Sequence, residues 1–191
     1  MNFCKKDWLA QERRYANADD FRQVFTTDKD RLYQLAFLLA GNQDIAERIF
    51  ASSLDDAVKS TGIFIDWARN WAKHTIIQNA IGIVHPQPRD DADFYMPASL
   101  AVTAAPLDVQ NRELALNRIL ELDDFERFVF VITVLEHYSD HDCALMLSAF
   151  FRDVRHTRVR AMQKIAAVEG SRSAFADRTQ ALPPQQHIYV P

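Results

Sequence analysis

Apolar residues recur at three- and four-residue spacing over most of the chain, which is the pattern of amphipathic α-helices. Gly41-Asn42 ends the first such segment as a typical helix stop, and Gly62 separates the second from the third. Helical segments are expected over residues 19–41, 44–60, 64–81 and 109–168. The pattern therefore predicts an all-α protein.

Prolines mark a boundary between two helical regions. Residues 82–108 contain Pro86, Pro88, Pro97 and Pro106, a composition typical of a flexible linker. After Glu169 the composition becomes that of a disordered tail. The expected organisation is an N-terminal arm (1–18), a first small helical module (19–81), a linker (82–108), a second module (109–168) and a tail (169–191).

Composition narrows the class of protein. Of 191 residues, 48% are hydrophobic and 25% are charged, as in an ordinary globular protein. The net charge of −4 argues against a chain that coats nucleic acid over its whole surface. It allows a local basic helix, because salt screens charges beyond ~8–10 Å. Without a ~20-residue apolar run, a signal peptide or a disulfide framework from Cys4 and Cys143, we expect a cytoplasmic protein.

A helix-turn-helix pattern occupies residues 139–165, and its second helix is abruptly basic. Ser139 with Asp142 three residues later predicts a capped helix start. From Phe150 to Ile165 there are five Lys or Arg residues and one Asp, whereas residues 119–149 hold seven acidic residues and one cation. This charge step indicates a recognition helix that lies on phosphate.

Two stretches resemble the extracytoplasmic-function class of bacterial RNA polymerase sigma factors. Asp30-Arg31-Leu32-Tyr33-Gln34-Leu35-Ala36, followed by Leu39-Ala40-Gly41-Asn42, is similar to the opening helix of their region 2. In the second stretch, the positions at the spacing of region 4 are Val129-Phe130, Glu136, Ser139, Ala144, Leu147, Val154-Arg155 and Arg160-Ala161. The resemblance covers about residues 20–81 and 114–166 and implies a region 2-like and a region 4-like module.

The chain departs from this family at four positions. Ala51 and Ser52 stand where the family has a Gln-Glu pair that grips the polymerase clamp. Ser148 and His137 stand where the family has glycines. A serine can occupy a turn, and histidine is among the residues less averse to positive φ, so we expect the turn to form.

The resemblance implies promoter recognition by both modules. Arg152 and Arg155 would read guanine edges or phosphate in the −35 element, and the alternative is a solvated basic face. The −35 candidates are Arg152, Arg155, His156, Arg158 and Arg160, and the −10 candidates are Arg69, Lys73, His74 and Gln78.

Two tryptophans in the third helical segment have two interpretations. Trp67 or Trp71 could stack on melted bases of the −10 element, near a loop of residues 59–62 that could hold a flipped base. Trp71, however, lies on the apolar stripe of its helix. We expect both to be core residues, Trp71 more clearly than Trp67.

The exposed side of the second helical segment would contact the polymerase clamp, as the resemblance implies. Its residues are Asp44, Glu47, Arg48, Ser52 and Asp55, and the alternative is an ordinary solvated face. The implied partners are core RNA polymerase, promoter DNA and an anti-sigma factor, with no membrane contact.

Two other classes of function are alternatives to promoter binding. His137, His141 and Cys143 invite a metal site, but a new helix beginning at Ser139 would separate the histidines and no fourth ligand is nearby. The sequence shows no catalytic constellation, so we expect no enzyme activity, cofactor or metal. The main rival is a sigma-derived interaction regulator without promoter recognition, which the departures at Ala51, Ser52 and Ser148 favour.

Overall fold

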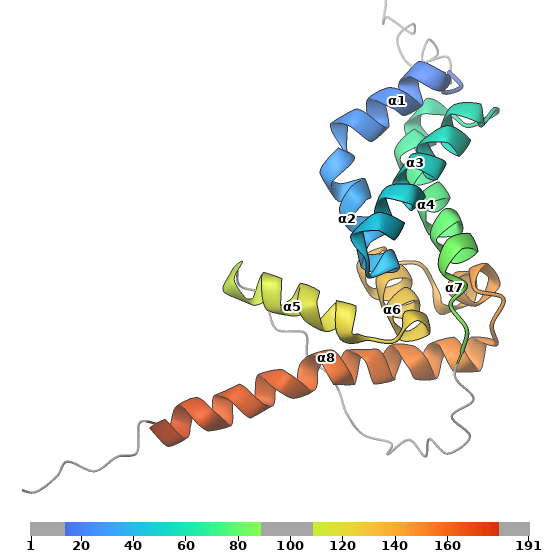
Figure 1. Cartoon of the computed structure of the whole chain (residues 1–191). Coiled ribbons are helices and arrows are strands. Elements are labelled where there is room, and N and C mark those ends of the chain that lie inside the picture. The colour runs from blue at the N-terminus through green and yellow to red at the C-terminus, as the bar shows by residue number, and fades with distance from the viewer. Residues whose placement is uncertain (1–13, 89–108, 180–191) are drawn as a thin grey trace, which may run out of the picture.

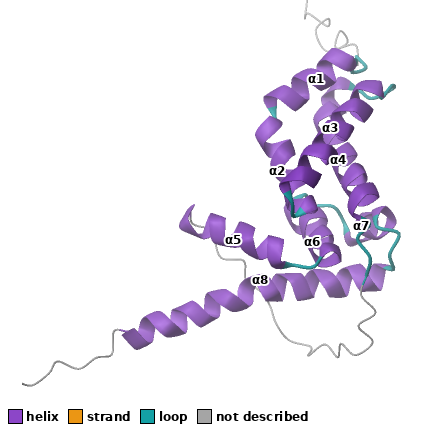
Figure 2. Cartoon of the chain, viewed as in Figure 1, coloured by secondary structure: helices purple, strands orange, loops and turns teal. Residues whose placement is uncertain are grey.

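The computed structural model describes residues 14–88 and 109–179 (Figure 1). Every regular element within these ranges is a helix, and the one β pairing there is an isolated antiparallel bridge between Tyr15 and Phe64 (Figure 2). The all-α prediction is therefore confirmed. None of the described helices combines the length and the apolar character that a membrane crossing requires.

The first half of the chain forms four α-helices and a short 3₁₀ turn. These are α1 (Ala18–Thr27), α2 (Lys29–Ala40), α3 (Gln43–Lys59), η1 (Ile65–Trp67) and α4 (Ala68–Val84). The single helix expected before Gly41 is thus two helices, which meet at Asp28. Gly41 ends α2 with φ of 68°, as its sequence predicts, and the side chain of Asn42 accepts hydrogen bonds from the first turn of α3.

The second half adds a further set of helices. These are α5 (Val109–Glu121), α6 (Asp124–Phe130), the π-helical turn η2 (Val131–Leu135), α7 (Asp140–Met146) and α8 (Phe151–Thr179). Because α8 continues to Thr179, the expectation of disorder is wrong for residues 169–179. Because α4 reaches Val84, residues 82–84 of the expected linker are helical. The rest of the expected arm, linker and tail, at 1–13, 89–108 and 180–191, lies outside the described residues.

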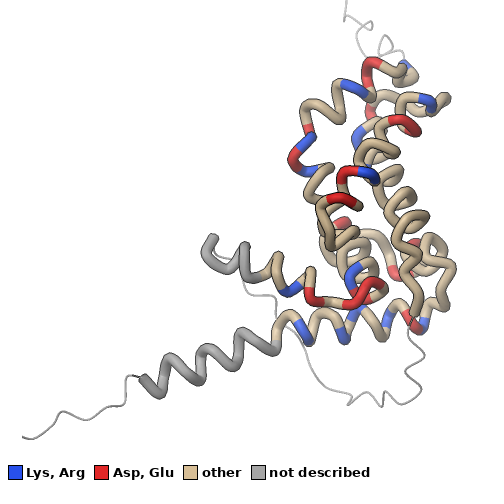
Figure 3. The backbone as a smooth tube through the Cα atoms, in the orientation of Figure 1, with Lys and Arg blue, Asp and Glu red and all other residues tan. Residues whose placement is uncertain are grey.

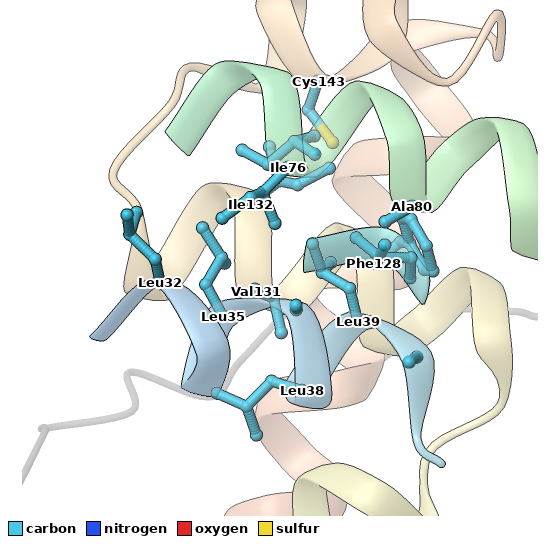
Figure 4. Close-up of a cluster of buried hydrophobic side chains, with 14 of the residues drawn as sticks. Leu32, Leu35, Leu38, Leu39, Ile76, Ala80, Phe128, Val131, Ile132 and Cys143 are labelled. Atoms are coloured by element: carbon cyan, nitrogen blue, oxygen red, sulfur yellow. The ribbon is translucent and has the colours of Figure 1, made fainter. Parts of the chain in front are cut away.

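One hydrophobic core joins the two halves. Leu35 and Leu39 of α2 belong to the same buried cluster as Phe128 of α6 and Val131 and Ile132 of η2 (Figure 4). The two helical regions expected from the sequence therefore share a core. The reason is that the C-terminal part of α2 is apolar on several sides, so it can pack on α3 and α4 and also on the second half.

Polar contacts link the same two halves. Lys73 Nζ on α4 lies 2.6 Å from Glu136 Oε2, just after η2. Arg127 of α6 is buried and donates hydrogen bonds to the carbonyl oxygen of Leu39. In Figure 1, α8 lies beneath this assembly, where it contacts α5, α6 and α7.

Candidate nucleic-acid interface

A helix-turn-helix is built from α7, the turn after it and the first half of α8. The Ser139 hydroxyl accepts a hydrogen bond from the Asp142 backbone N–H at 3.1 Å and donates one to Asp142 Oδ2 at 2.6 Å, so the predicted cap is confirmed. Ser148 in the turn has φ of 50°, and His137 before α7 has φ of 59°. Both residues therefore adopt the left-handed conformation expected at these positions.

The N-terminal part of α8 presents basic side chains to solvent. The Arg152 side chain is 81% exposed, and its Nε lies 3.8 Å from Asp153 Oδ1, a distance at which an exposed ion pair contributes little. Arg155 and His156 are exposed on the following turn, while Val154 and Thr157 between and beyond them are buried. Residues 152, 155 and 156 therefore lie on the solvent-facing side of the first turns of α8.

Farther along α8 the cations are engaged within the chain, which differs from the sequence-based expectation. Arg158 Nη1 lies 3.2 Å from Asp140 Oδ1 of α7, and Arg160 Nε lies 2.7 Å from Glu126 Oε1 of α6. Lys164 Nζ also lies 2.6 Å from Glu126 Oε2. Figure 3 shows Lys and Arg positions along α8 and acidic positions on the neighbouring helices. The sequence showed an abrupt change from acidic to basic residues, which indicated a phosphate-binding helix. Part of this contrast instead reflects ion pairs between α8 and the acidic segment before it.

The burial of Glu126 explains why it is paired with two cations of α8, Arg160 and Lys164. It is 1% exposed, and a buried carboxylate is costly unless it is paired and hydrogen-bonded. Lys164 donates to both of its oxygens, at 2.7 and 2.6 Å, and Arg160 supplies a second cation. Arg158 and Arg160 are therefore less available to a ligand than Arg152 and Arg155.

The −10 candidates on α4 do not form one open basic face. Arg69 is ion-paired with Asp28, and Lys73 with Glu136. His74 is half-buried with its ring centroid 5.5 Å from that of Trp71, and Gln78 is exposed. These four positions share the helix, but the structure brings only His74 into an aromatic environment.

The two tryptophans of this region differ in burial. Trp67 is 68% exposed, so the expectation that it is a core residue is wrong. Trp71 is half-buried, packs against the core and donates from Nε1 to Ser60 Oγ at 2.9 Å, as a partly buried indole requires. The 3₁₀ turn at 65–67 sets Trp67 before the first residue of α4, and so takes it off the apolar stripe that includes Trp71.

An open cavity of about 490 Å³ lies between these rings and the second half of the chain. Its aromatic lining comes from Phe64, Trp67, Trp71, His74 and Tyr138. Tyr138 was not singled out in the sequence, because only the packing of the 136–139 segment beside α4 brings it here. Burial, and then the charges of Glu136 and Asp142, raise the pKa of Tyr138, so its phenol is neutral at physiological pH.

The polymerase candidates on α3 are mostly where the sequence predicts. Asp44, Glu47, Arg48 and Asp55 are exposed along this helix. Ser52 is half-buried instead, and its Oγ lies 2.9 Å from Asn79 Oδ1 of α4. Ala51 beside it is exposed.

The metal hypothesis gains no geometric support in the described residues, where no group of three or more His, Cys, Asp and Glu side chains is placed to hold an ion. Ser139 does begin a new helix between His137 and His141, as expected. Cys143 is buried, and burial followed by the charge of Asp140 raises the pKa of its thiol to about 12.

Comparison with known proteins adds no family assignment. No model of a known protein family matches this chain. No curated protein sequence matches it either.

Proposed function

We propose that the chain is a sigma-factor-like transcription initiation protein that binds core RNA polymerase and promoter DNA. The observation that carries the proposal is the helix-turn-helix whose second helix exposes Arg152, Arg155 and His156 on its first turns. In this class of motif the N-terminal residues of the second helix contact base edges in the major groove. An exposed arginine there can donate two hydrogen bonds to guanine O6 and N7, which discriminates by about 1–3 kcal/mol.

Arg158 and Arg160 have a different role in this proposal. Their ion pairs with Asp140 and Glu126 fix α8 against α7 and α6. A recognition helix has to be held rigidly for its end to read bases, so these residues position the helix and the exposed pair contacts DNA.

The first half of the chain supplies the proposed contacts to the −10 element. The aromatic cavity beside Trp67 is large enough for a small planar ligand, and each base stacked on an aromatic side chain contributes about 1–3 kcal/mol. The α3 face with Asp44, Glu47 and Arg48 is the proposed polymerase contact.

A sigma-derived interaction regulator is the second candidate, and the shared core favours it. Two promoter elements lie two or three DNA turns apart, and the halves of this chain are packed on one another. Initiation at such a promoter therefore requires the halves to separate on polymerase, whereas a regulator can act in the packed state.

The two candidates are distinguished by promoter binding of a charge-deleted variant. Arg152→Ala combined with Arg155→Ala should abolish promoter binding and transcription while leaving the helical content unchanged, because both side chains are exposed. Arg22→Ala combined with Arg31→Ala removes the same charge from exposed positions of the first half and should have little effect. If the first double variant still initiates transcription normally, the assignment of α8 is wrong.

A second experiment tests the polymerase contact. Replacing Ala51 by Gln and Ser52 by Glu restores the family's pair and should tighten binding to core polymerase. Since Ser52 is hydrogen-bonded to Asn79, replacing it disturbs the contact between α3 and α4. Ala51→Gln alone leaves that contact intact. Unchanged affinity in both would mean that α3 is not the contact surface.

A further inference from the structure

Two exposed phenylalanines begin the helix that the proposed function places on DNA. Phe150 is 79% exposed and Phe151 is 48% exposed. The inward side of this part of α8 is formed by other residues, Val154, Thr157 and Ala161, all of which are buried. Packing within the chain therefore gives no reason for an aromatic ring at position 150.

Phe150 also stands where helices favour a different side chain. Its carbonyl accepts the first helical hydrogen bonds, from Asp153 N at 2.9 Å and Val154 N at 3.2 Å, which makes it the N-cap of α8. Ser, Thr, Asp and Asn are preferred at this position because their oxygens satisfy a free N–H of the first turn, and a phenyl ring has no acceptor. In α7 the side chain of Ser139 provides such a cap. With Phe150 at the N-cap, α8 lacks this stabilisation.

We propose that Phe150 is a specificity residue that contacts the 5-methyl group of a thymine, next to the base read by Arg152. The inference rests on the proposed function, since it requires the N-terminal end of α8 to lie in the major groove. The thymine methyl is the apolar group that base pairs present in that groove, and phenylalanine is among the side chains that contact it. Arg152 and Arg155 beside the ring favour a nucleic acid over an apolar protein surface.

The experiment removes single methyl groups from the DNA. The full-length protein selects binding duplexes from a random-sequence pool, and each thymine of the selected duplex is then replaced in turn by deoxyuridine. One replacement should weaken binding about three- to fivefold, the value for one buried methyl group, and the others should have no effect.

Phe150→Ser separates recognition from folding. Because serine is a good N-cap, this variant should keep or raise the melting temperature, whereas it should bind the thymine duplex more weakly and no longer distinguish it from the deoxyuridine duplex. Leu145→Ser is the matched control, since Leu145 is 67% exposed on α7 and should leave both properties unchanged.

Three results would contradict the inference about Phe150, and each has a different consequence for the proposed function. Equal binding of the thymine and deoxyuridine duplexes by the unaltered protein overturns the role of Phe150 and leaves the proposed function standing. If no duplex is enriched, both the role of Phe150 and the proposed function are wrong. If Phe150→Ser retains DNA affinity but loses polymerase, the ring contacts protein and the inference is wrong.

Discussion

The guanidinium group of Arg127 on α6 caps the C-terminal end of α2, where both Nε and Nη2 lie 3.4 Å from the carbonyl oxygen of Leu39. This carbonyl is one of the last four of α2, which have no partner within the helix. A cation there also interacts favourably with the helix dipole. Arg127 is 5% exposed and further donates to the Leu122 carbonyl at 3.1 Å and to Asp124 at 2.5 Å. It is therefore a buried polar link between the two halves.

Removing this guanidinium should destabilise the whole chain. Arg127→Ala leaves two buried carbonyl oxygens without a donor, so we expect it to lower the free energy of unfolding by about 2–3 kcal/mol in urea titrations. Arg22→Ala breaks the exposed Arg22–Asp19 ion pair and should cost less than about 1 kcal/mol. Similar losses in both variants would contradict the role of Arg127.

Gly41 should be intolerant of a side chain because of the same contact. Its φ is 68°, and a Cβ there would lie 3.1 Å from the Arg127 guanidinium carbon. Gly41→Ala should therefore destabilise the protein by about 1–2 kcal/mol. Gly82→Ala is the control, for which the opposite effect on stability is expected. Gly82 lies inside α4 and a Cβ there would have no atom within 4 Å, so the free energy of unfolding should rise by about 0.5–1 kcal/mol. Calorimetric melting of both variants checks the prediction.

Local signals in the sequence predicted several helix ends and the turn before α8, while contacts between residues distant in sequence were not predictable. The Gly41 stop, the Ser139 cap and the turn at Ser148 each depend on neighbouring residues, and all are observed. Glu126 and Lys164 are 38 positions apart, so only the folded chain shows that the basic helix neutralises part of its own acidic segment. The charge count therefore predicted too large an open cationic face.

The linker interpretation had a similar limit. Proline content predicts where a chain leaves regular structure, but it does not state whether the flanking helices pack together. The apolar residues of α2 that meet the second half, Leu35 and Leu39, have the same spacing as those that meet α3 and α4. Periodicity alone could not separate these two surfaces.

Cys143 should make stability depend on alkaline pH. In the unfolded chain its thiol titrates near 9.0, and in the folded chain burial raises the pKa to about 12. Between these values the unfolded state binds fewer protons, so stability is full below pH 9 and falls as the pH rises. Relative to Cys143→Ala, the unaltered protein should lose about 2 kcal/mol from pH 8 to 10.5 in urea titrations. Parallel pH curves would show that the thiol does not titrate as described.

Trp67 and Trp71 should respond differently to truncation. Trp71→Ala removes a half-buried indole and its hydrogen bond to Ser60, and should cost about 2–3 kcal/mol of unfolding free energy. Trp67→Ala removes a ring that is 68% exposed and should cost less than about 0.5 kcal/mol. If the two losses are equal in urea titrations, Trp67 is packed in solution.

The claim that the exposed end of α8 binds nucleic acid is tested most directly by the salt dependence of binding to random duplex DNA. Phosphate contacts by the two exposed arginines, Arg152 and Arg155, predict a slope of about −2 in a plot of log affinity against log salt concentration. Arg152→Ala combined with Arg155→Ala should reduce the magnitude of that slope by about 2. A slope near zero for the unaltered protein, or an unchanged slope for the double variant, would contradict it.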